Sequence, residues 1–172
     1  MPTKIRDVQP PHGLARTLYR LPIRLFHLHL GWLLMGHFLL LTHIGRKSGQ
    51  PRQTVLEVLL HDRAKDKYYV IAGWGERSDW VKNIEKTPQV QISVGLLHFC
   101  ALARRLPPEE AESKVIAYGR QHPHLIRYLP RLLGYRTDGT EEDLRALARL
   151  GIVVAFEPTR VQEVRARMSK RS

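Results

Sequence analysis

The sequence FLLLTHIGRKSGQPRQTVLEVLL, residues 38–60, decides the fold of this chain. Its two apolar runs, 38–44 and 54–60, flank a polar stretch, and this pattern predicts a β-hairpin with residues 45–52 as the loop. Two glycines permit positive φ there, so several backbone N–H groups can face one side and form an anion-binding nest. The loop also carries three basic side chains, which are Arg46, Lys47 and Arg52. The loop is therefore a candidate phosphate cradle, and the alternative is a hairpin with a solvated basic tip.

The order of residues in this loop excludes a P-loop. A P-loop places its lysine directly after the second glycine and opens a helix. Here Gly49 follows Lys47, and a strand is expected after the loop. Any phosphate binding would therefore come from a hairpin rather than from the end of a helix.

The composition limits the class of protein and the kind of partner. The chain has 172 residues, enough for one domain with a buried core. Its single cysteine, Cys100, cannot form an intramolecular disulfide and fits a reducing compartment, so a cytoplasmic protein is expected. Lys and Arg number 28 against 16 Asp and Glu, a net charge of +12, which favours anionic partners such as nucleic acid, anionic lipid or a phosphorylated ligand.

Residues 1–36 are interpreted as a polar lead followed by an amphipathic helical segment. Leucines recur at helical spacing from Leu14 to Leu28, and arginines fall on another face. Such a helix can lie on the inner face of an anionic membrane, or it can pack on its own domain. Residues 25–45 lack Lys, Arg, Asp and Glu over a length that could span a bilayer. The strand expected to end at Ile44 argues against a transmembrane helix.

The rest of the chain predicts an α+β domain, residues 37–158. Strands are expected at 37–44, 53–60, 67–72, 89–94, 96–104 and 151–158, from β-forming or alternating residues. A short helix is expected at 78–86 with Ser78 as its N-cap, and a helical excursion of three helices at 107–121, 124–133 and 140–150. About six short, mostly antiparallel strands suit a small barrel. A basic tail, 159–172, follows the last strand.

Several segments together resemble one family. They are the run from Leu41 to Arg52, the pair Ala72-Gly73, the spacing Trp80-x-x-Asn83, the segment 88–90 and the terminal strand 152–158. This set is similar to the signature of the deazaflavin-dependent nitroreductase family. The resemblance implies a split β-barrel of the FMN-binding type that binds coenzyme F420, a deazaflavin with a phosphodiester and an oligoglutamate tail. It also implies hydride transfer to a small organic electron acceptor such as a quinone, a nitroaromatic or an enone.

The resemblance also implies where the coenzyme lies. The residues expected to hold its phosphate and acidic tail are Arg46, Lys47, Ser48 and Gly49, with Arg52 beside them. Those expected near the coenzyme from other elements are Thr54, Trp74, Gly75, Trp80 and Asn83. Two features depart from the family pattern: the loop 73–79 is shorter, with Trp74 where a lysine is usual, and the tyrosine-bearing substrate region has no match within 105–150. No catalytic residue is therefore assigned.

Other interpretations stay open at this point. FMN could place its own phosphate in the same loop. A non-enzymatic basic module is the alternative from another class, although nucleic acid is disfavoured because the aromatic residues are not interleaved with the basic ones. His98 and Cys100 would share a strand face, but such a pair does not make a metal site, and no metal is expected. Because split barrels often pair, a homodimer is one candidate assembly.

Overall fold

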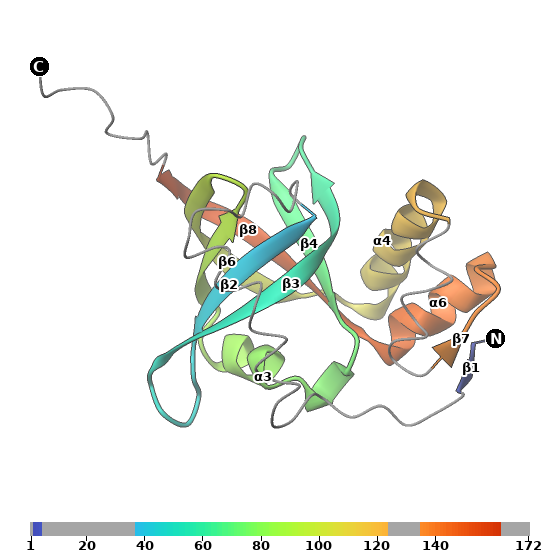
Figure 1. The fold of residues 1–172 in the computed structure, drawn as a ribbon, viewed down its shortest axis with the longest axis horizontal. Coiled ribbons are helices and arrows are strands. Elements are labelled where there is room, and N and C mark those ends of the chain that lie inside the picture. The colour runs from blue at the N-terminus through green and yellow to red at the C-terminus, as the bar shows by residue number, and fades with distance from the viewer. Residues whose placement is uncertain (1, 5–36, 124–134, 163–172) are drawn as a thin grey trace, which may run out of the picture.

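Six antiparallel strands close into a barrel in the computed structural model, which describes residues 2–4, 37–123 and 135–162. Their order around the barrel is β2-β3-β4-β8-β6-β5 (Figure 1). The bounds are β2 Phe38–Ile44, β3 Pro51–Asp62, β4 Lys67–Ala72, β5 Gln89–Val94, β6 Leu97–Arg105 and β8 Ile152–Gln162. The predicted α+β split barrel of about six strands is confirmed.

The hairpin at residues 38–60 forms as predicted, with a longer second strand. Leu39 lies opposite Leu56 and Leu41 opposite Thr54 in the β2–β3 ladder. Opposite residues in an antiparallel pair point to the same side of the sheet. The alternating positions Leu39, Leu41 and Leu56 therefore face the barrel interior, where they join the core. The extra residues of β3 at Pro51 and Arg52 pair with Ile44 and His43, so the loop between the strands is only 45–50.

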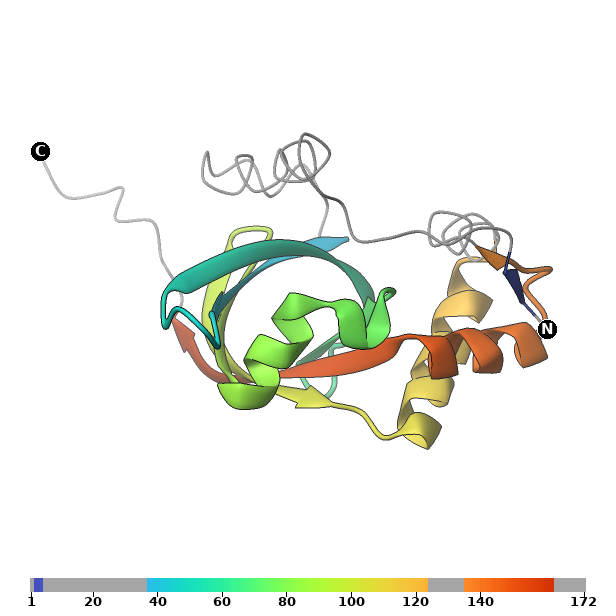
Figure 2. The same ribbon diagram turned by 90° about the horizontal axis from the view of Figure 1, so that it is seen from below.

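The barrel interior is filled by aliphatic and aromatic side chains from all six strands. The short helix α3, Asp79–Lys86, contributes Val81 and Ile84 to the same core. Figure 2 shows α3 lying across one opening of the barrel, beside the hairpin loop between β2 and β3. The helix therefore closes one end of the barrel and brings a chain segment from beyond β4 to the hairpin loop.

A second core forms on the outer face of the barrel. The helices α4, Pro108–Gln121, and α6, Glu141–Leu150, pack there against outward side chains of β3, β4 and β8. Gly119 allows the two helices to approach closely, because a Cβ at this position would lie 2.5 Å from Leu144 Cδ1. A small sheet of β1, Thr3–Lys4, and β7, Tyr135–Arg136, lies at the same side of the molecule as α6 (Figure 1).

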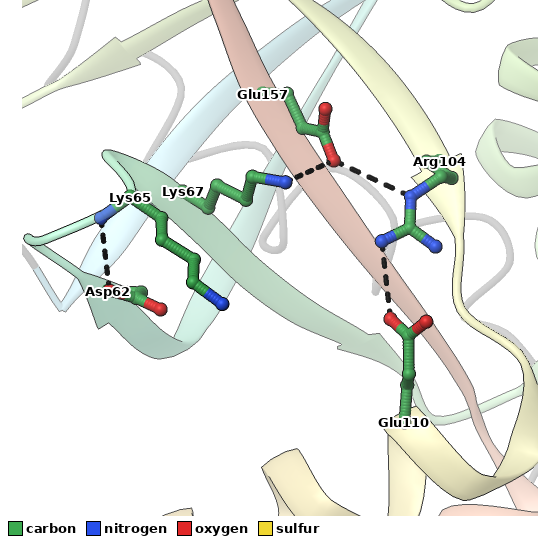
Figure 3. Close-up of polar contacts among 6 residues, drawn as sticks. All are labelled: Asp62, Lys65, Lys67, Arg104, Glu110 and Glu157. Atoms are coloured by element: carbon green, nitrogen blue, oxygen red, sulfur yellow. Dashed lines mark hydrogen bonds and ion pairs between the residues drawn. The ribbon is translucent and has the colours of Figure 1, made fainter.

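A line of ion pairs connects three strands with α4 (Figure 3). Lys67 Nζ on β4 lies 2.7 Å from Glu157 Oε1 on β8, and Arg104 on β6 contacts both Glu157 and Glu110 of α4. The hydrogen bond from Lys67 holds the pKa of Glu157 below its ordinary value. These side chains are partly exposed, so each pair stabilises the fold only modestly. Their arrangement fixes the start of α4 against the barrel.

The predicted end of the last strand needs correction, and three other predicted segments lie outside the residues that the structure describes. The last strand does not end at Pro158 but continues to Gln162, because β6 pairs with it as far as His98 opposite Gln162. The predicted helices at 14–36 and 124–133, and the tail beyond residue 162, lie outside the described residues. Residues 38–44 form a strand, and no helix within the described ranges is long and apolar enough to cross a bilayer.

Candidate anion-binding site

The loop 45–50 is a tightly bonded turn. The Gly45 N–H donates to Gln50 O over 2.9 Å, and the Gly49 N–H donates to Gly45 O over 2.8 Å. The Gln50 N–H donates to Ser48 Oγ over 3.3 Å. Gly49 has φ +66°, which favours glycine, and a Cβ on Gly45 would lie 2.8 Å from Ser48 Oγ, so Ser48 would have to shift to accommodate it. Three of the amides expected to form an anion nest are therefore used inside the loop.

Arg46 is bound to α3 rather than free at the loop tip. Its backbone N–H donates to Asn83 Oδ1 over 3.0 Å, and its Nη1 donates to the same oxygen over 3.1 Å. Its Nη2 lies 2.9 Å from Asp79 Oδ1. Its Nη1 also donates to Asp79 O over 3.4 Å, so three acceptors at α3 hold the guanidinium and fix the loop in place. Arg46, one of the three predicted loop cations, therefore holds the loop against α3.

The remaining donors of the loop point to solvent. Lys47, Ser48 and Arg52 are exposed. Across the described part of the chain, no protein acceptor receives the amide N–H groups of Lys47 and Ser48, the Lys47 ammonium or the Arg52 guanidinium. A cation that the sequence did not indicate lies close by, since Lys86 Nζ donates to Arg46 O over 3.0 Å. Two free amides with neighbouring positive charges make a surface that suits an anion.

Asn83 joins the loop to the barrel interior. The residue is 5% exposed, and its Oδ1 accepts both hydrogen bonds from Arg46. Its Nδ2 lies 3.2 Å from His43 Nδ1 on β2. The predicted site residue Asn83 is therefore close to the loop, but its polar atoms are occupied by protein partners. It positions the loop and offers little to a ligand.

His43 is a residue of this site that sequence reasoning missed. It is 4% exposed at the end of β2, and burial lowers the pKa of its imidazole below 6.5. Arg52, opposite it in the ladder, lowers the pKa further. One signal was present in the sequence, because His43 continues the inward alternation of Leu39 and Leu41. A polar residue at a position that faces the core usually has a buried partner.

Two predicted residues lie on the barrel side of the site. Thr54 is half-buried on β3 and shares the inward face with its ladder partner Leu41. Trp80 is half-buried on α3 and packs against the barrel core. The structure thus gives Trp80 a packing role, and it leaves Thr54 between the core and the end of the barrel.

Trp74 and Gly75 lie in the connection between β4 and α3, where a 3-10 turn covers Gly75–Arg77. Gly75 has φ +52°, and a Cβ there would lie 3.1 Å from Leu150 O, so this glycine lets the connection approach the end of α6. Trp74 Nε1 and Ser78 Oγ are buried, and neither has a hydrogen-bond partner among the described residues. Ser78 occupies the N-cap position as predicted, but its side chain does not bond the helix amides.

The other polar candidates do not gather into a site. His98 Nδ1 lies 2.7 Å from Ser93 Oγ, while Cys100 is exposed on the same strand. No group of three or more His, Cys, Asp or Glu side chains capable of holding a metal ion occurs in the ranges that the structure covers.

The closed antiparallel barrel has the architecture of the split-barrel, FMN-binding type of fold. A family model described as F420H(2)-dependent quinone reductase matches residues 22–126. Because this match covers more than half of the 172 residues, the chain belongs to that family. The predictions of an oxidoreductase and of a deazaflavin coenzyme are confirmed at the level of the family. No curated protein matches the chain significantly.

Solved structures similar to this chain include other split barrels. An F420-H2 dependent reductase, FDR-A, is 24% identical over 70% of this chain and 94% of its own, with a TM-score of 0.48. A conserved hypothetical protein from Mycobacterium tuberculosis is 16% identical over 78% of this chain and 80% of its own, with a TM-score of 0.53. A pyridoxamine 5′-phosphate oxidase-related, FMN binding protein from Nostoc punctiforme is 13% identical over 81% and 80%, with a TM-score of 0.51. The last two support the fold.

The residues present fit the anionic part of an F420-type coenzyme. A phosphodiester and a carboxylate tail need several donors and cations at one surface, and the free amides of Lys47 and Ser48 with the charges of Lys47 and Arg52 supply them. The buried Trp74 Nε1 has no acceptor within the described residues.

Proposed function

We propose that this protein transfers a hydride from reduced coenzyme F420 to a small organic acceptor and holds the coenzyme phosphate at the loop 45–50. The observation that carries the proposal is the exposed tip of this loop, where two backbone amides and two cations lack protein partners within the described chain. Family membership supports the coenzyme, and the description of the family favours a quinone over the nitroaromatic and enone alternatives.

The residues of the loop and its neighbours fall into two groups: those that bind the coenzyme and those that hold the loop in place. Lys47, Ser48 and Arg52 bind the phosphate and the first carboxylates of the tail. Gly49 supplies the backbone conformation of the loop that directs their donors to solvent. Arg46 and Asn83 hold the loop on α3. Lys86 adds positive charge behind the loop. This division replaces the simpler expectation that every residue from Arg46 to Gly49 contacts the coenzyme.

The number of free donors is sufficient for useful affinity. A hydrogen bond to a charged group contributes about 1.5–3 kcal/mol net. Three or four such bonds supply about the 8 kcal/mol that a micromolar dissociation constant requires. The ring system of the coenzyme is then free to contribute specificity through Thr54, Trp74 and the half-buried Trp80 near the same end of the barrel.

The coenzyme supplies the hydride when it is bound, so the protein needs no nucleophile. The residues of this chain bind the anionic end, orient the ring and exclude water from it. The acceptor gains a hydride and a proton, and the source of the proton has no assigned side chain.

FMN is the second candidate, because similar barrels include an FMN binding protein and its phosphate could use the same loop. A fluorescence titration of the purified full chain with F420 and, separately, with FMN distinguishes the two. We expect micromolar or tighter binding of F420. Binding of FMN without binding of F420 would overturn the proposal. A homodimer, a cytoplasmic location and a membrane contact of the N-terminal segment stay predictions from the sequence.

A further inference from the structure

A chain of side chains runs from the barrel interior to the anion-binding loop. His43 Nδ1 contacts Asn83 Nδ2 over 3.2 Å, and Asn83 Oδ1 accepts from the Arg46 N–H over 3.0 Å and from Arg46 Nη1 over 3.1 Å. Arg46 then reaches Asp79 on α3. This His43–Asn83–Arg46 chain links β2, α3 and the loop, and its two inner members are almost fully buried.

We propose that His43 is a positioning residue that sets the conformation of the anion-binding loop through the side-chain amide of Asn83. The inference rests on the proposed function, because coenzyme binding gives this loop its task. Neither the family description nor the motif that marks the loop assigns a role to His43.

The two ends of the Asn83 side-chain amide face different partners. The Arg46 N–H and guanidinium are donors, so they require the amide oxygen. The amide nitrogen, which carries two hydrogens, must then face His43, and His43 Nδ1 has to accept. Only a neutral imidazole with its proton on Nε2 can do so. A neutral His43 therefore stabilises the same Asn83 amide orientation that Arg46 requires, and this orientation holds Arg46 in place.

The surroundings of His43 keep it neutral. Burial is the largest cause of its lowered pKa, and the Arg52 guanidinium across the ladder acts in the same direction. A backbone hydrogen bond at Ile44 and the carboxylate of Asp79 raise the pKa. Asp79 is itself paired with Arg46, and Lys86 lies behind the same loop, so the charges that face this region are mainly positive. The net result is a pKa below 6.5.

Protonation of His43 would put a hydrogen on Nδ1. Both His43 Nδ1 and Asn83 Nδ2 would then be donors, and the hydrogen bond between them would be lost. Because the pKa is lower in the folded chain than in the unfolded chain, the loop is fully held above about pH 6.5 and is released as pH falls through the folded pKa. Coenzyme affinity should therefore fall with acidification as His43 releases the loop.

The first test observes the loop without any coenzyme. In ¹⁵N NMR spectra of the full chain, the Arg46 backbone amide and the Asn83 side-chain amide should shift together as pH is lowered from about 8 to about 5, around one pKa below the ordinary histidine value. In a His43→Asn variant, whose amide oxygen can accept from Asn83 without titrating, this shift should disappear. Arg46 and Asn83 resonances that titrate equally in both proteins would overturn the proposal.

The second test measures F420 affinity by fluorescence. His43→Leu should weaken binding more than tenfold at neutral pH, while His43→Asn should stay within about threefold of wild type and lose the acid-dependent weakening. His98→Asn, on β6 and bonded to Ser93, is the matched control and should behave as wild type. Wild-type affinity in His43→Leu would contradict the inference, provided that thermal unfolding shows a folded protein. Failure of wild type to bind F420 would reject the proposed function, and the NMR test would still decide the role of His43.

Discussion

The loop 45–50 and the connection 73–78 both begin from glycine-containing sequence, and both were expected to contact the coenzyme, yet they are built in opposite ways. In the loop, the glycines shape a turn whose inner polar groups are paired and whose tip is exposed. In the connection, Gly75 lets the backbone approach Leu150 O, and two polar atoms are buried without partners in the described residues. The loop thus presents donors to solvent, whereas the connection encloses them.

Replacing the residue that braces the loop should have the largest effect. Asn83→Ala leaves the Arg46 N–H and the His43 ring without their partner, so we expect the free energy of unfolding to fall by about 3 kcal/mol and F420 binding to be lost. Urea unfolding and fluorescence titration measure the two effects. Lys82→Ala, on the exposed side of the same helix, is the control. An Asn83→Ala protein as stable as the control would show that the buried network contributes little.

Changing Gly75 in the connection should lower stability without changing affinity. Gly75→Ala combines φ +52° with a close approach to Leu150 O, so we expect a loss of about 1–3 kcal/mol in unfolding free energy. The folded fraction should bind F420 with affinity close to that of wild type. Differential scanning calorimetry and a titration below the midpoint temperature test this. Weakened binding by a fully folded Gly75→Ala protein would place Gly75 itself in the ligand site, as the sequence predicted.

Removing the exposed cation Lys47 should weaken coenzyme binding without lowering stability, which is the reverse of the effect expected for Gly75→Ala. Lys47→Ala should weaken F420 binding about tenfold, which corresponds to about 1.4 kcal/mol, and leave thermal stability unchanged because Lys47 has no acceptor in the described structure. Arg46→Ala should lower stability as well, since its contacts hold the loop on α3. Lys65→Ala, at the exposed turn after β3, is the control. If the affinity of Lys47→Ala equals that of Lys65→Ala, the loop is only a solvated hairpin tip.

The smallest expected effect belongs to Trp74. Trp74→Phe removes a buried N–H that lacks an acceptor in the described chain, so the free protein should gain up to about 1 kcal/mol of stability. If Trp74 Nε1 serves as a donor to the coenzyme, the same change should weaken F420 binding severalfold. Parallel thermal-shift experiments with and without F420 separate the two results. If the gain in stability of Trp74→Phe is the same with and without F420, Trp74 does not contact the coenzyme.

The barrel was predictable because its signals are local. The inward residues of β2 and β3 alternate with outward ones, and Lys67–Ala72 and Gln89–Val94 have the bounds expected from their β-forming residues. The end of β8 was not predictable in this way. Pro158 looks like a stop, but a bulge between Cys100 and Ala101 in the β6–β8 pairing lets the strand continue past it to Gln162.

The candidate site was predictable in position and only partly in chemistry. The order of glycines and basic residues indicated a loop for an anion, and the family resemblance added α3 through Trp80 and Asn83. Ser78 was expected to cap α3 with its side chain, yet its Oγ is buried and makes no cap hydrogen bond. His43 was missed because a single histidine in an apolar strand has no partner until another element is packed against it.

The sequence by itself determined that a basic, glycine-containing loop lies between two strands, because composition and alternation act over neighbouring residues. It could not distinguish Arg46 from Lys47, which are adjacent and carry the same charge. Tertiary structure made that distinction. Packing α3 across the barrel end brings Asn83 and Asp79 beside a loop more than thirty residues earlier in the chain. These acceptors bind Arg46, and Lys47 is left facing solvent, because the position of a partner in space, and not the charge alone, decides whether a donor is free to bind a ligand.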